Sequence, residues 1–239
     1  MPIDKIIDQY RVLGNPIHQS KSPNIHQAFA AATNQHINYQ AQLVVEKDFE
    51  YTVRQFFAAG GKGLNITVPF KQRAFAMAQV HSPAAAKAEA ANTLYLNAQA
   101  QLVADNTDGL GLVRDICHNL KGQLNAKRIL VLGSGGAVRG VLQPILAQRP
   151  AQVVIANRTY TKACDLVALF TDLGAIEAIP MAQLQGSFDW IINGTSASLT
   201  GDLPPLPKGL INNTSRCYDM MYGAQTTVFN QWALNQGAA

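Results

Sequence analysis

The chain has 239 residues, of which 48% are hydrophobic and 14% charged, a length and composition typical of one large or two modest globular domains. Its 19 Lys and Arg against 15 Asp and Glu give a net charge of +4, and because the basic residues are scattered singly we expect no nucleic acid partner. Charges in the N-terminal stretch argue against a signal peptide, and no apolar run approaches the roughly 20 residues that cross a bilayer, so we expect a cytoplasmic protein without membrane contact.

The first half of the chain alternates strand-like and helical stretches. Strand-like runs are expected at residues 10–14, 37–45 and 63–68, and helical stretches at residues 23–33, 48–60 and beyond Pro69. Two more extended pieces, residues 92–97 and 101–106, follow an Ala-rich segment. This rhythm predicts an α/β domain over residues 1–106 with a mainly parallel sheet.

The second half, residues 107–239, reads as a series of βαβ units. A connecting helix from Thr107 and a polar loop lead into it. The elements expected next are strand 128–133, helix 136–148, strand 152–157, helix 159–173, a strand near Ile176, strand 188–193, a Pro-rich loop at 202–209, strand 216–220 and a helix from Thr226. Such repeats predict a parallel sheet with helices on both faces, which is the Rossmann-like arrangement.

A glycine-rich turn follows the first strand of this second half and opens a helix. Its residues are Gly133, Ser134, Gly135, Gly136 and Ala137. In a Rossmann-type turn, glycines let the backbone approach a pyrophosphate, which then sits at the helix N-terminus. A turn that only packs a helix on a strand has a similar sequence, but the strand before it and the helix after it favour a dinucleotide site.

The end of the next strand indicates which dinucleotide is bound. NAD-selective folds place Asp or Glu there, whereas this chain has Asn157, Arg158 and Thr159, with Lys162 following. Arg158 can bind a 2′-phosphate through charge-assisted hydrogen bonds. A solvated arginine is the alternative, but a cation near a helix N-terminus is unfavourable by about 0.3–1 kcal/mol. We therefore expect NADP rather than NAD.

Three segments of the first half are polar where an α/β turn needs no such chemistry. They are residues 20–23, 65–71 and 106–109, each between a strand and a helix. If their strands are parallel, these loops converge at the carboxyl edge of the sheet, where α/β proteins bind ligands. Ser20, Ser22 and Asp108 could equally be helix caps or first-turn residues.

Eight segments, in this order, resemble the signature segments of the shikimate dehydrogenase family: GNPIHQSKSP, GGKGLNITVPFK, AANTL, ADNTDGLG, VLGSGGAVRG, NRT, INGTS and CYDMMY. The resemblance covers nearly the whole chain, and ordered motifs are more specific than one glycine pattern. It implies a reversible, NADPH-dependent reduction of 3-dehydroshikimate to shikimate. That reaction belongs to the shikimate pathway, which leads to chorismate and the aromatic amino acids.

The resemblance also implies roles for individual residues. Lys71 and Asp108 form the catalytic pair, in which we expect Lys71 to donate a proton as an ammonium acid and Asp108 to hold it and the reacting hydroxyl. Substrate contacts are implied for Ser20, Ser22, Thr67, Lys71, Asn92, Asp108 and Tyr222. NADP contacts are implied for Gly133 to Ala137, for Asn157, Arg158, Thr159 and Lys162, and, near the nicotinamide half, for Thr195, Ser196 and Met220.

Two departures from the family pattern carry expectations. Lys162 stands where the family often has Arg, so the charge is kept but the bidentate fork is lost. Family members also continue beyond WALNQGAA through helices that return to the substrate domain. We expect the shortened chain to bind NADP but to be impaired in turnover.

The remaining expectations concern metals, assembly and rival functions. Five histidines and three cysteines form no H-x-x-x-H or C-x-x-C pattern, so we expect neither a metal site nor disulfides. We expect a monomer or homodimer that binds shikimate or 3-dehydroshikimate. The alternatives are a quinate/shikimate dehydrogenase that uses NAD and a non-catalytic NADP-binding module.

Overall fold

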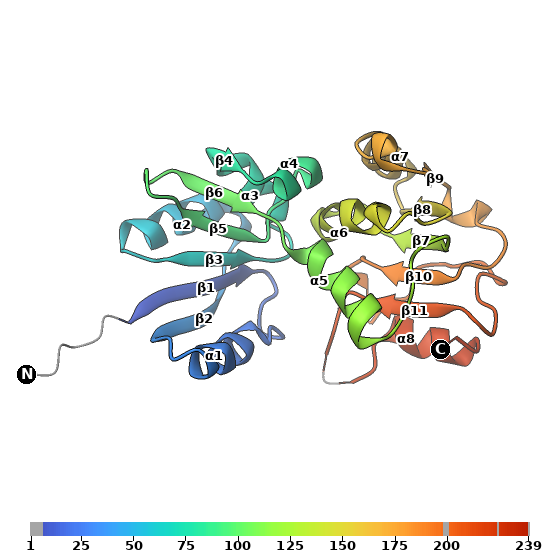
Figure 1. The fold of residues 1–239 in the computed structure, drawn as a ribbon, viewed down its shortest axis with the longest axis horizontal. Helices are drawn as coiled ribbons and strands as arrows, with labels where there is room; N and C mark the ends of the chain where they lie inside the picture. The colour runs from blue at the N-terminus through green and yellow to red at the C-terminus, as the bar shows by residue number, and fades with distance from the viewer. Residues whose placement is uncertain (1–6, 198–200, 224, 239) are drawn as a thin grey trace, which may run out of the picture. The chain divides into compact units, whose positions relative to one another are not determined.

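The chain folds into two compact units, residues 1–107 and residues 108–239, shown in Figure 1. The structure is a computed structural model, and it describes residues 7–197, 201–223 and 225–238. In these ranges no helix is long and apolar enough to cross a membrane.

The first unit is built on one six-stranded sheet. Its strands are β1 (Asp8–Gly14), β2 (Ile37–Leu43), β3 (Gly63–Ile66), β4 (Val80–His81), β5 (Thr93–Leu96) and β6 (Leu102–Asp105). Their order is β2-β1-β3-β5-β6-β4. The strand β5 is antiparallel to β3 and β6, while the other pairings are parallel. The predicted mainly parallel sheet is confirmed, with β4 added because two residues are too short for a periodic signal.

Helices cover both faces of this sheet. They are α1 (Ser22–Ala32), α2 (Phe49–Ala58), α3 (Lys71–Met77) and α4 (Pro83–Ala88), with a 3-10 turn, η1 (Glu46–Asp48), before α2. Because side chains alternate along a strand, Leu13 points into the core shared with α2, α3 and α4, whereas Val12 belongs to a smaller cluster on the other face. That cluster includes Tyr39, against which α1 packs through His26.

The second unit contains a five-stranded, fully parallel sheet. Its strands are β7 (Arg128–Leu132), β8 (Gln152–Ala156), β9 (Ile176–Ala178), β10 (Trp190–Asn193) and β11 (Arg216–Asp219), in the order β11-β10-β7-β8-β9. Alternate residues of β7 enter different cores: Ile129 and Val131 lie in one, Leu130 and Leu132 in the other. A strand buried on both faces explains the continuous apolar run in its sequence.

The helices of the second unit lie on both faces, as predicted. The unit contains α5 (Asp108–Arg114), α6 (Gly136–Ala147), α7 (Tyr160–Ala168) and α8 (Val228–Asn235), with a π-helical segment η2 (Asp115–Asn119) and 3-10 turns η3 (Thr171–Leu173) and η4 (Met181–Gln183). The core of Ile129 includes residues of α5, α6 and α7, and the core of Leu130 includes Phe229 of α8. The last helix begins after Thr227 because the Thr227 hydroxyl accepts a hydrogen bond from Asn230 N at 3.3 Å and caps it.

Candidate functional site

In the second unit, the predicted cofactor residues follow four neighbouring parallel strands. The glycine turn follows β7, the Arg158 loop follows β8, Thr195 follows β10, and Met220 follows β11. Parallel strands end at the same edge of a sheet, so these segments share one edge. The chain proceeds from β7 to β8 and β9, then returns to place β10 and β11 on the other side of β7. The edge above β7 and β10 is therefore a topological switch point, the usual ligand position in open α/β sheets.

The turn after β7 requires a glycine at its first position. Gly133 has a φ of +105°, and a Cβ there would lie 3.3 Å from Gly194 and from the Thr195 Cγ2 atom. Its N–H donates to Ala156 O at 2.8 Å, which joins the turn to the end of β8. The next helix, α6, begins after Gly135 without a side-chain cap. Such a helix start presents backbone N–H groups to an anion.

The loop after β8 presents two cations beside a helix start. Arg158, Thr159 and Lys162 are exposed, and Thr159 is the N-cap residue of α7 although its side chain makes no capping bond. The Asn157 amide donates to Thr159 O at 2.9 Å and so fixes the loop. A phosphate bound there would meet both positive side chains and the helix N-terminus.

The ends of β10 and β11 contain polar residues that the sequence analysis did not single out. Asn193 is fully buried and Asp219 partly buried, and the Asn193 Nδ2 donates to Asp219 Oδ1 at 3.0 Å. The preceding strands were recognisable, but only the pairing of β10 with β11 brings the two side chains together. Beyond them, Ser196 is exposed and Tyr222 is 52% exposed, so Tyr222 is not a core residue.

In the first unit, four polar segments meet at one edge of the sheet. β1 and β3 are parallel, so the loops after them, which contain Ser20 and Thr67, leave the same edge. The strand β5 runs the other way and therefore begins at this edge, directly after Asn92. β6 reverses again and ends there before Thr107. The convergence predicted from parallel strands is present, but it depends on one antiparallel strand.

Hydrogen bonds hold these segments close together. Thr67 N donates to Leu13 O at 2.9 Å. The Asn92 Nδ2 donates to the Thr107 hydroxyl at 2.8 Å, and its Oδ1 accepts from Thr107 N at 3.1 Å. Lys71 opens α3, where its carbonyl accepts from Ala91 N at 2.8 Å. Thr67, Lys71 and Asn92 are therefore positioned by one backbone framework.

The two serines of the first loop have a local role as well. The Ser20 hydroxyl accepts from Ser22 N at 3.3 Å, which stabilises the entry to α1. The N-cap residue of α1 is Lys21 rather than either serine, and its side chain makes no capping bond. Helix capping in the strict sense therefore does not explain why serine stands at these positions.

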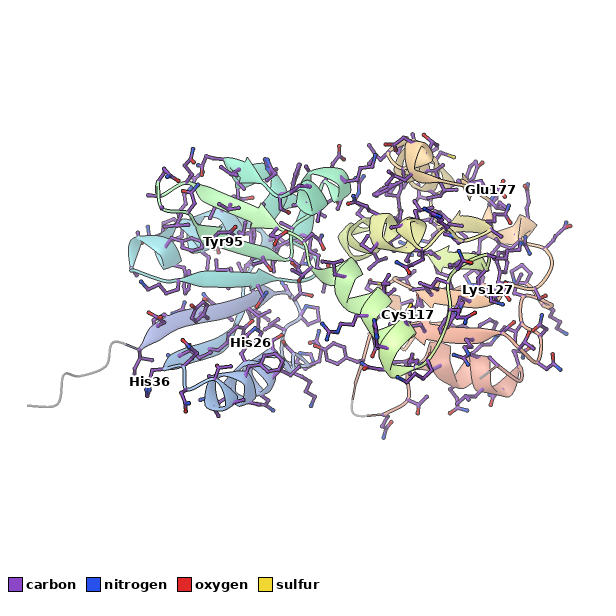
Figure 2. All side chains as sticks on the ribbon, viewed as in Figure 1. His26, His36, Tyr95, Cys117, Lys127 and Glu177 are labelled. Atoms are coloured by element: carbon purple, nitrogen blue, oxygen red, sulfur yellow. The ribbon has the colours of Figure 1, made fainter. Side chains whose placement is uncertain are left out.

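A second polar network in the first unit was also missed. The Asn65 Oδ1 accepts from the Tyr39 hydroxyl at 2.6 Å, and its Nδ2 donates to the Thr93 hydroxyl at 3.3 Å. The ring of His26, labelled on α1 in Figure 2, stacks on Tyr39 with centroids 4.0 Å apart. Asn65 lies within a segment identified as polar, whereas the Tyr39 position gave only a strand pattern.

Asp108 opens α5, and α5 crosses α6 at a pair of small residues. A Cβ on Gly109 would lie 2.5 Å from Gly140 O and 2.6 Å from the Pro144 Cγ. This close approach fixes the first turn of α5 against α6 inside the second unit. Of the predicted catalytic pair, Lys71 belongs to the first unit and Asp108 to the second.

The described residues include no group of three or more His, Cys, Asp and Glu side chains that could hold a metal ion. The free thiols are Cys117, Cys164 and Cys217. Burial raises the pKa of the Cys217 thiol to about 12, so this cysteine is a poor nucleophile.

The fold and the site together define a class of protein, namely a two-unit α/β protein whose second unit is Rossmann-like. The chain belongs to the shikimate dehydrogenase family. The family model for the shikimate dehydrogenase substrate binding domain matches residues 12–94, and the model for shikimate / quinate 5-dehydrogenase matches residues 115–200. The predicted family is thereby confirmed.

Curated relatives cover most of the chain. The NADP(+) shikimate dehydrogenase of Cellvibrio japonicus is 57% identical over 233 residues, which are 97% of this chain and 84% of the relative. That of Alkalilimnicola ehrlichii is 53% identical over 232 residues, which are 97% of this chain and 86% of the relative. These names agree with the predicted enzyme class and cofactor.

A solved structure of a shikimate dehydrogenase has the same fold. Shikimate 5-dehydrogenase from Thermus thermophilus, crystallised with NADP(H) and shikimate, superposes with a TM-score of 0.83 at 26% identity. The match covers 97% of this chain and 85% of that one.

Proposed function

We propose that this chain catalyses the reversible NADPH-dependent reduction of 3-dehydroshikimate to shikimate, a step towards chorismate and the aromatic amino acids. The observation that carries the proposal is the 53–57% identity to two NADP(+) shikimate dehydrogenases over 97% of the chain. The residues proposed to bind NADP and substrate lie at the two sheet edges described above.

The second unit supplies the NADP site. Its glycine turn and the uncapped start of α6 fit a pyrophosphate, because Gly133 adopts a conformation that other residues rarely reach and the α6 N-terminus faces the turn. Arg158, Thr159 and Lys162 would hold the 2′-phosphate. Absence of a carboxylate at the end of β8 removes the usual preference for a free ribose hydroxyl. When bound, NADPH supplies the hydride.

The first unit supplies the substrate site. Ser20, Ser22, Thr67 and Asn92 present hydroxyl and amide groups suited to a polyhydroxylated carboxylic acid. The resemblance to the family also gives Tyr222 a role in substrate binding. As the carbonyl carbon is reduced, its oxygen gains negative charge and needs a proton. We assign that proton transfer to Lys71, and the resemblance to the family gives Asp108 the second place in the catalytic pair.

This proposal assigns residues 1–106 to substrate and residues 107–239 to NADP, with Ser196 beside Thr195 and Met220 near the nicotinamide half. Cytoplasmic location and a monomeric or homodimeric state stay predictions. No second function is favoured by an observation. An NAD-using quinate enzyme is disfavoured by Arg158, which suits a 2′-phosphate. A non-catalytic NADP-binding module would not need the catalytic roles proposed for Lys71 and Asp108.

Replacing Lys71 tests the catalytic assignment. In Lys71→Ala, NADPH oxidation with 3-dehydroshikimate should fall by about 10²-fold or more, since a positioned proton donor contributes about 10²–10⁴-fold. The Kd for NADPH, measured by fluorescence titration, should stay within about twofold, because Lys71 lies outside the NADP unit. The matched control is Lys62→Ala, an exposed lysine of the same unit, which should keep full turnover. A Lys71→Ala protein with parental turnover would refute the assignment.

A further inference from the structure

Asn193 and Asp219 end neighbouring parallel strands and are register partners in the β10–β11 pairing. Asn193 has no exposed surface. A buried carboxamide is costly unless its hydrogen bonds are satisfied. The contacts of these two side chains therefore indicate why polar residues stand where β10 is otherwise apolar.

The Asn193 carboxamide both accepts and donates hydrogen bonds. Its Oδ1 accepts from Thr195 N at 3.1 Å and from the Thr195 hydroxyl at 2.7 Å. Its Nδ2 donates to Asp219 Oδ1 at 3.0 Å, and the same carboxylate oxygen accepts from Met221 N at 3.0 Å. The pair thus links the loop after β10 to the loop after β11.

The loop after β10 also packs against the glycine turn, and the loop after β11 packs against the loop after β10. Gly194 N donates to Leu132 O at 2.9 Å, and Met220 N donates to Asn193 O at 2.9 Å. A Cβ on Gly194 would lie 3.2 Å from the Met220 sulfur, and one on Gly133 would lie 3.3 Å from the Thr195 Cγ2. A shift of either loop would therefore change the site next to the turn.

We propose that Asn193 and Asp219 are positioning residues that hold Thr195 and Met220 in place for the nicotinamide half of NADPH. This inference rests on the proposed function, because that function assigns Thr195 and Met220 to the nicotinamide end. The 2′-phosphate end of the adenine half is assigned to the loop after β8, a strand that β7 separates from β10 and β11 in the sheet. Loss of the pair should weaken one half of the cofactor site and spare the other.

The chemistry sets which substitutions are tolerated. Because Asn193 Oδ1 receives both Thr195 donors, its Nδ2 must face Asp219, and position 219 must present an acceptor. Asp219→Asn keeps an oxygen for both Asn193 Nδ2 and Met221 N, so it should behave nearly as the parent. Asp219→Ala removes the acceptor, and Asn193→Ala removes the whole link.

The test compares two ligands by titration of the full chain: NADPH and adenosine 2′,5′-bisphosphate, which contains only the adenine half. Asn193→Ala and Asp219→Ala should raise the Kd for NADPH about tenfold or more, with the Kd for the bisphosphate within about twofold and a lower kcat. Asp219→Asn should stay within about threefold of the parent for both ligands. Equal losses for both ligands, or no loss for NADPH, would overturn the proposal.

Ser215→Ala is the matched control for a destabilised sheet. Ser215 is also fully buried, and its hydroxyl donates to Phe188 O at 2.6 Å, but it precedes β11 at the opposite edge. This substitution should lower the Tm without changing the Kd for NADPH relative to the Kd for the bisphosphate. If an alanine variant fails to fold, Thr195→Val, which removes the hydroxyl bond to Asn193 and the longer one from Ala197 N, must show the same selective loss. Parental NADPH affinity in that variant would contradict the proposal. A parent chain that binds both ligands but never reduces 3-dehydroshikimate would contradict the proposed function and leave this comparison valid.

Discussion

At the scale of single residues, the site depends on positions with no room for a side chain. Gly194→Ala would place a Cβ 2.4 Å from the Val138 Cγ2 and 3.2 Å from the Met220 sulfur. We expect the free energy of unfolding to fall by about 1–3 kcal/mol, the usual cost of overpacking, and NADPH affinity to fall because the displaced atoms adjoin the glycine turn. Thermal unfolding and NADPH titration measure the two effects.

Gly111→Ala is the control for that substitution. Gly111 lies in α5, and a Cβ on it would have no atom within 4 Å other than those of its chain neighbours and its own helix backbone. Alanine inside a helix is favoured over glycine by roughly 0.5–1 kcal/mol, so this variant should be as stable as the parent or more stable. A Gly194→Ala chain that matched it in Tm and NADPH affinity would contradict the packing argument.

Residues became predictable where a local pattern determined their role. Gly133 stands between an apolar strand and a helix, and Arg158 follows β8 where NAD enzymes usually have an acid, so the sequence alone made both of them candidates. Asn193, Asp219 and Asn65 were not, because their partners are 26 to 28 residues away. Only strand pairing brings such partners together.

At the scale of elements, an ion pair joins α3, which begins at Lys71, to α2. The Arg73 Nε donates to Glu50 Oε1 at 2.8 Å, and a second bond joins Arg73 Nη2 to Glu50 Oε2. The Arg73 guanidinium also lies 5.3 Å from the Phe49 ring centroid. The hydrogen bonds from Arg73 hold the pKa of Glu50 below its usual value.

Glu50→Gln should therefore destabilise the chain in a pH-dependent way. A carboxyl whose pKa is lowered by folding stabilises the fold above its unfolded pKa and loses that effect as the pH falls through its folded pKa. Both side chains are about one-third exposed, so we expect only about 0.5–1 kcal/mol near neutral pH. Denaturant titrations of parent and variant should converge as the pH falls below about 4.5, near the ordinary pKa of a glutamate.

Glu46→Gln is the control for the ion pair, because Glu46 offers Arg73 its backbone carbonyl. Its effect on the free energy of unfolding should be smaller than that of Glu50→Gln. A difference between parent and Glu50→Gln that persists unchanged in acid would show that the carboxylate charge is not its source.

Helix and strand positions followed from periodicity, and their deviations have local causes. The helix expected over 159–173 ends at Ala168 and continues as the 3-10 turn Thr171–Leu173. The helix expected from Thr107 becomes π-helical after Arg114. Periodicity does not distinguish these helix types here, because segments of 3 and 5 residues are too short for their different numbers of residues per turn to show in the sequence.

At the scale of the whole molecule, the division into two α/β halves and the parallel second sheet could be predicted, since βαβ repeats allow few arrangements. The antiparallel β5 could not, because alternating side chains look alike in both strand directions. That one strand places Asn92 beside Thr67. The sequence therefore predicted the sheet edge at which the segment of Thr67 and Lys71 lies, whereas the place of Asn92 at that edge follows only from the pairing of β5 with β3.

The central claim is that this chain reduces 3-dehydroshikimate with NADPH, and the ratio of kcat/KM for NADPH to that for NADH tests it most directly. With 3-dehydroshikimate saturating, the ratio should exceed about 10², because the 2′-phosphate gains charge-assisted hydrogen bonds from Arg158 that NADH cannot make. Each tenfold in that ratio corresponds to about 1.4 kcal/mol. A ratio near one, or no oxidation of either cofactor, would contradict the account.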